Sequence, residues 1–323
     1  MDWAFANGYS RYYAAAGWAS FELPFLRWAE RTGYRVHVIA QDDLELHPGC
    51  LSGYRCAVIV GHEEYWSRPM RQTVDRFVES GGRIARFAGN FMWQTRLEQG
   101  GSVQTCFKYL ARERDPLRET DPLRLTSAWE DPVVGLPGAT TFGVNGCRGQ
   151  YAGWGAAAPR SPRGFQVFRP RHWSLAGSGL GYGDMFGDEA GIFGLEVDGV
   201  EYTFQDGLPV PTGVDGTPEG LQIVAMGWAT LAEDAQPEHA AQRFLADSDA
   251  RFAARILDGT DADDAVERRA RGCGVMVSFQ RGRGEVFCAA SCEWVRGLIQ
   301  GDYYTQRITR NVLDRFLAEP GPA

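Results

Sequence analysis

The stretch that decides the fold reads Cys56-Ala57-Val58-Ile59-Val60-Gly61 and leads straight into His62-Glu63-Glu64. A near-continuous apolar run that ends at a glycine is typical of a strand buried on both faces, as in a parallel sheet. Residues 83–88 predict the next strand, and residues 69–80 between the two carry apolar side chains at helical spacing. The glycines at 81 and 82 supply the end of that helix.

The same pattern continues upstream. Residues 24–32 predict a helix, with Pro24 in its first turn and Gly33 just past its end, and residues 36–40 predict a strand. The order helix, strand, strand, helix, strand therefore predicts an α/β fold with a mostly parallel sheet flanked by helices.

Downstream, helical periodicity fades from about residue 90, and glycine, tryptophan, phenylalanine and proline become dense. We expect residues 1–323 to form one domain that carries further segments. They are a β/loop-rich insertion (91–220), a strand (221–225), a mobile or helical excursion (231–271), a hairpin (275–279 with 285–289) and a final amphipathic helix (302–317).

Composition excludes several classes of protein. Hydrophobic residues make up 44% of the 323 residues and charged residues 23%, which is the balance of a globular protein. The net charge of −8 argues against a nucleic-acid partner, because phosphate contacts dominate that affinity. The sequence has no apolar run long enough to span a membrane and no secretory signal pattern, so we expect no membrane contact and a cytoplasmic location. The seven cysteines include no CxxC pair, which favours free thiols.

Candidate chemistry follows the first apolar strand. Ligands in open α/β sheets bind outside the carboxyl ends of the strands, and a histidine with carboxylates there can bind metal or move protons. His62 and Glu64 are two apart, so in an extended chain both point to the same side. The alternative is that this loop only caps the following helix, with Ser67 as N-cap.

Two further candidates lie outside that loop. Asn90 follows the next strand and could orient a carbonyl group, although an asparagine after Gly89 can also serve a left-handed turn. Glu196 lies among aromatic residues, where a carboxylate would suit a general base; the alternative is a solvated turn around Asp198.

Covalent and zinc chemistry find little support. The turn after the second strand holds Gly89 and Asn90 where a nucleophile elbow would hold a serine or cysteine, and G-x-S-x-G is absent from the chain. The H-E-x-x-H pattern is absent as well. Lys108 is the only lysine, so any lysine-based chemistry would have to use that residue.

Several of these motifs, in this order and spacing, resemble one family. They are residues 23–28, 33–34, 60–67, 87–90 and 307–314. Together they resemble the C-terminal domain of the N,N-dimethylformamidase large (beta) subunit, over about residues 21–317. The resemblance implies a glutamine amidotransferase-like (flavodoxin-like) three-layer sandwich without the cysteine nucleophile.

The resemblance also implies a metal site. The family's enzymes are amidohydrolases with a mononuclear iron, Fe(III), held by two tyrosines and a glutamate. Glu64 falls at the glutamate ligand, and Tyr9 and Tyr12 (with Tyr13 beside them) are the tyrosines available upstream. His62 and Asn90 fall at neighbouring active-site positions, and Glu196 at the catalytic glutamate.

The resulting functional hypothesis is an iron-dependent hydrolase of a small amide or formamide, with a glutamate as general base. The family's enzymes use a small partner subunit; the need for one here stays open, as does a homo-oligomer. The rival hypothesis is a non-catalytic amidotransferase-like module that binds a small molecule or scaffolds a partner. A sugar-binding protein is a third reading, because the tryptophan-rich middle of the chain could stack on sugars.

Overall fold

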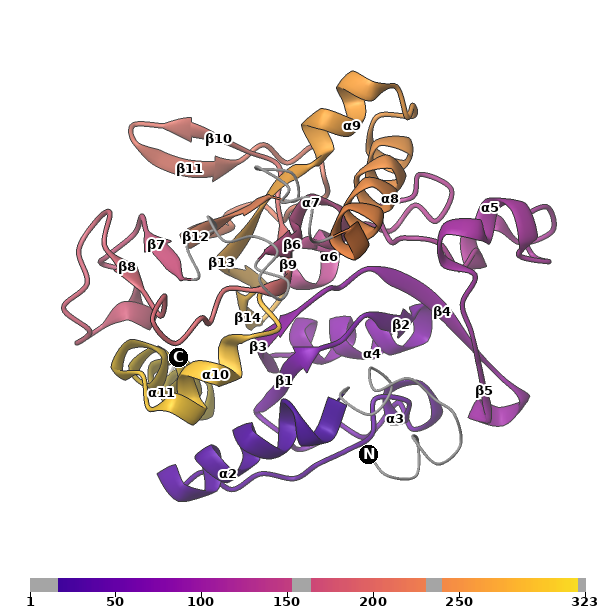
Figure 1. Ribbon diagram of the computed structural model, residues 1–323. Coiled ribbons are helices and arrows are strands. Elements are labelled where there is room, and N and C mark those ends of the chain that lie inside the picture. The colour runs from indigo at the N-terminus through magenta and orange to yellow at the C-terminus, as the bar shows by residue number, and fades with distance from the viewer. Residues whose placement is uncertain (1–16, 153–163, 231–239, 319–323) are drawn as a thin grey trace.

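The computed structural model describes residues 17–152, 164–230 and 240–318, and its main sheet is mixed (Figure 1). Seven strands lie in the order β1-β3-β14-β13-β12-β7-β8. Their bounds are β1 Cys56–His62, β3 Arg83–Gly89, β14 Gly284–Ala289, β13 Arg271–Arg281, β12 Gln222–Thr230, β7 Phe165–Val167 and β8 Met185–Phe186. Within this sheet β3 pairs in parallel with β1 and β14, and all the other pairings are antiparallel.

The prediction of a mostly parallel, flavodoxin-like three-layer sandwich is therefore wrong. From β14 onward the sheet continues by antiparallel pairs and curls. An apolar run does not reveal strand direction, because a strand buried on both faces gives the same run whichever way its neighbour points. The direction comes instead from the turn: Arg281 pairs with Gly284, and so tight a link allows only an antiparallel hairpin. That hairpin confirms the one expected from residues 275–289.

A second difference concerns the strand expected at residues 36–40. These residues have no regular structure, and Val36 and Val38 are 37% and 58% exposed. Alternating apolar residues form a strand only where a neighbouring strand pairs with them, and none of the described strands does so here. As a result β1 lies at the edge of the described sheet, and it is partly exposed rather than buried on both faces.

The helices begin and end where local signals place them. Helix α2 (Glu22–Thr32) ends at Gly33, whose φ of 97° suits glycine. Helix α4 (Arg68–Glu79) begins after Ser67, and α11 (Tyr303–Leu317) begins after Asp302. These three confirm the predicted helices. The other α-helices are α3 Asp43–Leu46, α5 Ala111–Arg114, α6 Ala139–Phe142, α7 Gly146–Gly149, α8 Ala240–Leu257, α9 Asp263–Arg269 and α10 Trp294–Gln300.

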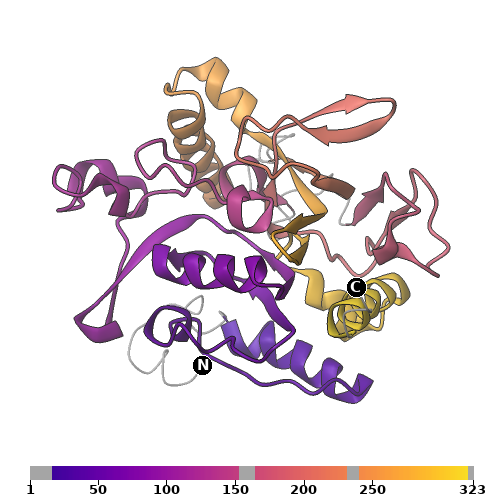
Figure 2. The ribbon, with the colours of Figure 1, turned by 180° about the vertical axis from the view of Figure 1, so that it is seen from behind.

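Helices cover both faces of the sheet at its parallel edge. Helix α4 lies on one face, and α2, α10 and α11 lie on the other (Figures 1 and 2). Alternate residues of β3 join the two cores: Ile84 packs with the apolar face of α4, whereas Phe87 packs with Phe25 and Trp294. This packing fixes β3 at the centre of the parallel part.

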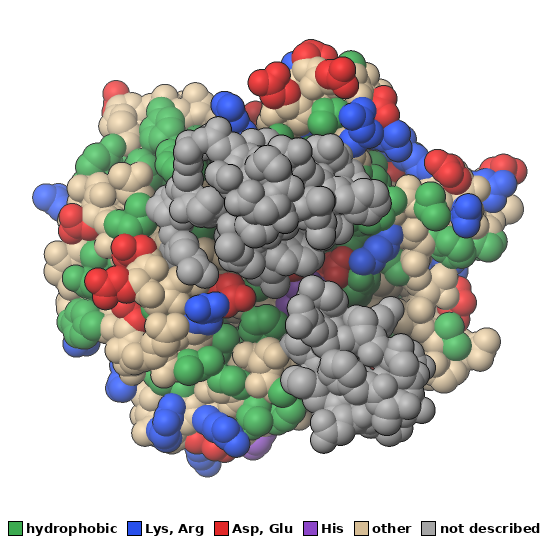
Figure 3. All heavy atoms as spheres, in the orientation of Figure 1, with side chains coloured by type: hydrophobic (Ala, Val, Ile, Leu, Met, Phe, Trp, Pro, Cys, Tyr) green, Lys and Arg blue, Asp and Glu red, His purple; other side chains and the backbone are tan. Residues whose placement is uncertain are grey.

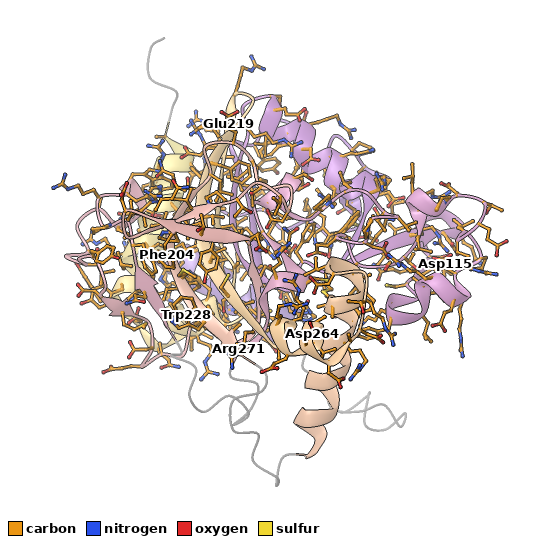
Figure 4. All side chains as sticks on the ribbon, turned by 90° about the horizontal axis from the view of Figure 1, so that it is seen from above. Asp115, Phe204, Glu219, Trp228, Asp264 and Arg271 are labelled. Carbon is orange, nitrogen blue, oxygen red and sulfur yellow. The ribbon has the colours of Figure 1, made fainter. Side chains whose placement is uncertain are left out.

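Three small sheets surround the main one. Strand β2 (Tyr65–Ser67) pairs in parallel with β4 (Trp93–Glu98), which pairs with β5 (Val103–Thr105). Strand β6 (Gln150–Ala152) pairs with β9 (Leu195–Gly199), and β10 (Tyr202–Gln205) forms a hairpin with β11 (Leu208–Pro211). Seen from above, Phe204 on that hairpin and Asp115 after α5 lie on opposite sides of the molecule (Figure 4). Of the excursion expected at 231–271, residues 231–239 lie outside the described part; α8 and α9 occupy much of the rest.

The surface carries charges of both signs. On the face shown in Figure 3, acidic and basic side chains are interspersed wherever described residues are visible. Across the described ranges, none of the helices has the length and apolar character needed to cross a bilayer.

Candidate functional site

Four residues singled out in the sequence converge at the carboxyl ends of β1 and β3. His62 ends β1 and pairs in parallel register with Gly89, so Asn90 follows at the same edge. Glu64 lies between β1 and β2. Glu196 arrives on β9, whose backbone is held at this edge because Cys292 N–H donates to the Glu196 carbonyl oxygen at 3.1 Å. Segments far apart in the sequence therefore meet in one polar cluster.

The Nε2 atom of His62 lies at the centre of this cluster. It is 2.9 Å from Glu196 Oε2, 3.6 Å from Glu64 Oε2 and 3.3 Å from Asn90 Nδ2. The side chains of His62, Glu64 and Glu196 are 26%, 13% and 13% exposed, so solvent reaches the cluster only partly. A small ligand could enter, and the charges are not fully screened by water.

The protonation of Nε2 determines whether His62 donates or accepts a hydrogen bond. When Nε2 carries a proton it donates to Glu196, and when Nε2 is bare it can accept from the Asn90 amide. Burial opposes protonation, but the hydrogen bond to Glu196 and the negative charges of Glu196 and Glu64 together raise the pKa of His62 above its usual value. The imidazole can therefore hold and return a proton beside two carboxylates.

The N-cap and the left-handed turn, which the sequence offered as alternatives to a functional site, are both present together with the cluster. Ser67 does cap α4, because its Oγ accepts the Met70 N–H at 3.2 Å. Asn90 does adopt a left-handed conformation, with φ 65°. The cap and the turn adjoin the polar cluster, so they help to position its residues and do not replace it. The solvated turn considered for Glu196 is not found, since that residue lies on β9 and Asp198 is buried.

Two residues that the sequence analysis did not select fix the Glu64 carboxylate. The Trp93 indole N–H donates to Glu64 Oε1 at 2.7 Å, and the Lys108 ammonium donates to the same oxygen at 2.9 Å. Lys108 also lies over the Tyr65 ring, 4.8 Å from its centroid. Both donors engage Oε1, which leaves Oε2 facing His62. The signal that could have identified Lys108 is its rarity, because every other basic residue is an arginine.

The described residues supply one clear metal-ligand candidate. Glu64 has a hard carboxylate oxygen, Oε2, on the inner side of the cluster, which fits a single oxygen ligand to Fe(III). Tyr9 and Tyr12, the other predicted ligands, lie outside the described residues. Within the described ranges, no group of three or more His, Cys, Asp or Glu residues is arranged to hold a metal ion. Any such site would therefore need oxygen donors from elsewhere.

Two other histidines of the described part make their contacts away from this cluster. His37 contacts the Tyr54 hydroxyl at 2.7 Å, and the His172 ring contacts the Ser174 hydroxyl at 2.8 Å. Burial lowers the pKa of His172 to about 4, so this ring is neutral at physiological pH. All seven cysteines lie in the described part of the chain, and none of them forms a disulfide there.

Comparison with known proteins identifies the family. A comparison with curated proteins gave no match. The sequence profile of one protein family matches residues 4–306, which is nearly the whole chain, and confirms the resemblance seen in the motifs. The chain belongs to the family described as N,N-dimethylformamidase beta subunit-like, C-terminal.

Proposed function

We propose that the chain hydrolyses a small amide or formamide at the cluster around His62. The observation that carries the proposal is the approach of Glu196, Glu64 and Asn90 to within 2.9, 3.6 and 3.3 Å of one imidazole nitrogen. A carboxylate, an imidazole and an amide together supply proton transfer and a hydrogen bond to a carbonyl oxygen, which amide hydrolysis needs. The family description supports a reaction of this kind.

Glu196 is the general base in this proposal. Its carboxylate takes a proton from the water that attacks the carbonyl carbon, and it later gives that proton to the amine when the C–N bond breaks. His62 keeps the carboxylate in place through the contact of 2.9 Å and can carry the proton in between. The second hydrogen of the Asn90 amide is available to the carbonyl oxygen as negative charge develops on it.

We further propose that Glu64, Tyr9 and Tyr12 hold a mononuclear Fe(III). When bound, iron supplies Lewis-acid activation of the carbonyl or of water. Within the described part, Trp93 and Lys108 orient the Glu64 carboxylate by saturating Oε1. Such hydrogen bonds fix the direction in which a ligand oxygen points and tune its basicity.

The test combines metal analysis, a visible spectrum and an amide screen on the purified chain. We expect about one iron per chain and a tyrosinate-to-iron absorption band, followed by amine release from N,N-dimethylformamide and related small amides. Glu64→Gln should lose the iron, whereas Glu196→Gln should keep the iron and lose turnover. Glu219→Gln, a change at an exposed position, serves as the control. Retention of iron and activity by both Glu64→Gln and Glu196→Gln would refute the assignment.

One observation favours the second candidate, a non-catalytic module. The Lys108 ammonium already pairs with Glu64 at 2.9 Å, so this carboxylate is partly neutralised without any metal. The module would bind a small amide or a partner through the same cluster and would show neither iron nor turnover. The family description refers to a beta subunit, so we also propose a small partner subunit, which co-purification and mass measurement would detect.

A further inference from the structure

A buried ionic cluster lies directly behind the polar site. Its members are Arg86 on β3, Glu63 between His62 and Glu64, and Asp198 on β9, and their side chains are 0%, 6% and 0% exposed. The Arg86 guanidinium donates from Nε to Glu63 Oε1 and from Nη2 to Asp198 Oδ2, the latter at 2.6 Å. Its third nitrogen, Nη1, lies 3.0 Å from the Cys288 sulfur on β14. One side chain thus joins four segments of the chain.

Both carboxylates of this cluster lie within two residues of a residue of the site. Glu63 separates His62 from Glu64, and its N–H donates to the Gly89 carbonyl oxygen at 3.3 Å. Asp198 is two residues beyond Glu196 on the same strand. Its Oδ1 accepts the Phe91 N–H at 2.9 Å, so it also holds the turn that follows Asn90. The contacts of Arg86 therefore set the spacing between the three segments that carry the site.

Stability alone does not explain such a cluster. A buried ion pair rarely stabilises a fold more than well-packed apolar residues would, because both charges lose their hydration. Arg71, which is also fully buried, is satisfied differently: its hydrogen bonds go to carbonyl oxygens and to the hydroxyls of Thr140 and Thr141. Carboxylate partners appear at Arg86, where charged hydrogen bonds with fixed directions give orientation that apolar packing lacks.

We propose that Arg86, Glu63 and Asp198 are positioning residues that hold His62, Asn90 and Glu196 in register. The inference deepens the proposed function, because it concerns the same site. All three side chains are buried behind the site, so we assign them a role that acts through the residues beside them. Loosening the cluster should disturb the contact of 2.9 Å between His62 and Glu196 before it unfolds the protein.

The test is Asp198→Asn in the full chain. The asparagine keeps an oxygen for the Phe91 N–H, but it loses the charge that holds Arg86. The chain has five histidines, so metal-free protein labelled with ¹⁵N-histidine gives few imidazole signals at a fixed pH, and His62→Gln assigns the one that matters. We expect the His62 signal of Asp198→Asn to move toward its position in Glu196→Gln. We also expect kcat to fall about 10-fold or more with KM little changed, because misplaced reacting groups weaken the transition state more than binding.

Asp75→Asn is the matched control. Asp75 pairs with Arg281, and Arg281 belongs to the hairpin end beside the start of β3, whereas the site follows the other end of β3. Asp75→Asn removes the charge of a partly buried carboxylate that also pairs with an arginine, yet it should leave the His62 signal and kcat unchanged. If Asp198→Asn fails to fold, Glu63→Gln tests the positioning role instead, because it keeps an oxygen for the Arg86 guanidinium and removes only the charge.

The outcomes separate the two ideas. A folded Asp198→Asn or Glu63→Gln whose His62 signal and kcat match the unmodified chain overturns the positioning role. If the unmodified chain hydrolyses no amide, the proposed function fails, and the His62 signal still decides whether the cluster positions the site. A shift of that signal in Asp75→Asn as large as in Asp198→Asn would also overturn the inference, since any buried carboxylate would then have the same effect.

Discussion

Replacing Gly89 by alanine should destabilise the protein through one defined collision. Gly89 is the last residue of β3, where β9 passes across the sheet edge. A Cβ at this position would lie 2.4 Å from the Glu196 carbonyl oxygen, 2.7 Å from the Cys292 nitrogen and 3.1 Å from the Cys292 sulfur. The φ of Gly89 is not in the left-handed region, so an alanine would be strained only by these neighbours.

The size of the destabilisation depends on which atoms the new Cβ would contact. The two closest atoms are backbone atoms and are joined by the hydrogen bond from Cys292 N–H to the Glu196 carbonyl oxygen. Neither can rotate away, so β9 must move and that bond must lengthen or break. Overpacking a buried position costs about 1–3 kcal/mol, and one lost hydrogen bond adds about 1 kcal/mol. We therefore expect the free energy of unfolding to fall by about 2–4 kcal/mol.

Urea unfolding of Gly89→Ala and Gly49→Ala, followed by circular dichroism, measures this difference. At Gly49 a Cβ would meet no atom within 4 Å and φ is not positive, so its alanine variant should change stability by less than about 0.5 kcal/mol. Equal stability of the two variants would show that β9 is not packed against the end of β3 as described. Because β9 carries Glu196, Gly89→Ala should also lower amide turnover.

Three further predictions concern single side chains. Trp93→Phe keeps the ring but removes the N–H donated to Glu64, so iron affinity should fall about 10-fold in a metal titration, while unchanged affinity would contradict the orienting role. Burial lowers the pKa of His172 to about 4, so its neutral form stabilises the fold above about pH 6.5, and that stability is lost as the pH falls toward 4. Urea unfolding at pH 7.5 and 4.5 should therefore show that the free energy of unfolding falls by roughly 2 kcal/mol less in His172→Asn than in the unmodified chain. Ser67→Ala removes the oxygen that accepts the Met70 N–H, and thermal unfolding should show a loss of about 1 kcal/mol; no loss would mean that the cap is dispensable.

Local signals explain which elements could be predicted from the sequence. Helix ends are determined within a few residues: Gly33 ends α2 and Asp302 caps α11 through the Thr305 N–H. The hairpin of β13 and β14 likewise depends on a short turn. These features need no knowledge of distant segments, and the structure confirms them.

Properties that depend on distant segments were not predictable in the same way. Whether residues 36–40 form a strand depends on a neighbouring strand, and the direction of β13 depends on a turn rather than on its seven consecutive buried residues. The donors to Glu64 come from residues 29 and 44 positions away. Arg86 reads in the sequence as one of many arginines, and only the fold shows that its partners are Glu63 and Asp198.

The error in fold class left the grouping of the candidate residues intact, and the reason is geometric. The rule that places ligands at the carboxyl ends of strands requires only two adjacent parallel strands whose ends lie at one edge. Strands β1 and β3 are such a pair, with His62 opposite Gly89, whatever the rest of the sheet does. The antiparallel part then adds what the parallel pair lacks, since the turn after β14 binds the backbone of β9 and brings Glu196 to within 2.9 Å of His62. Loss of the Cys292–Glu196 backbone contact would leave His62, Glu64 and Asn90 together and would remove one of the bonds that hold the proposed base at this edge.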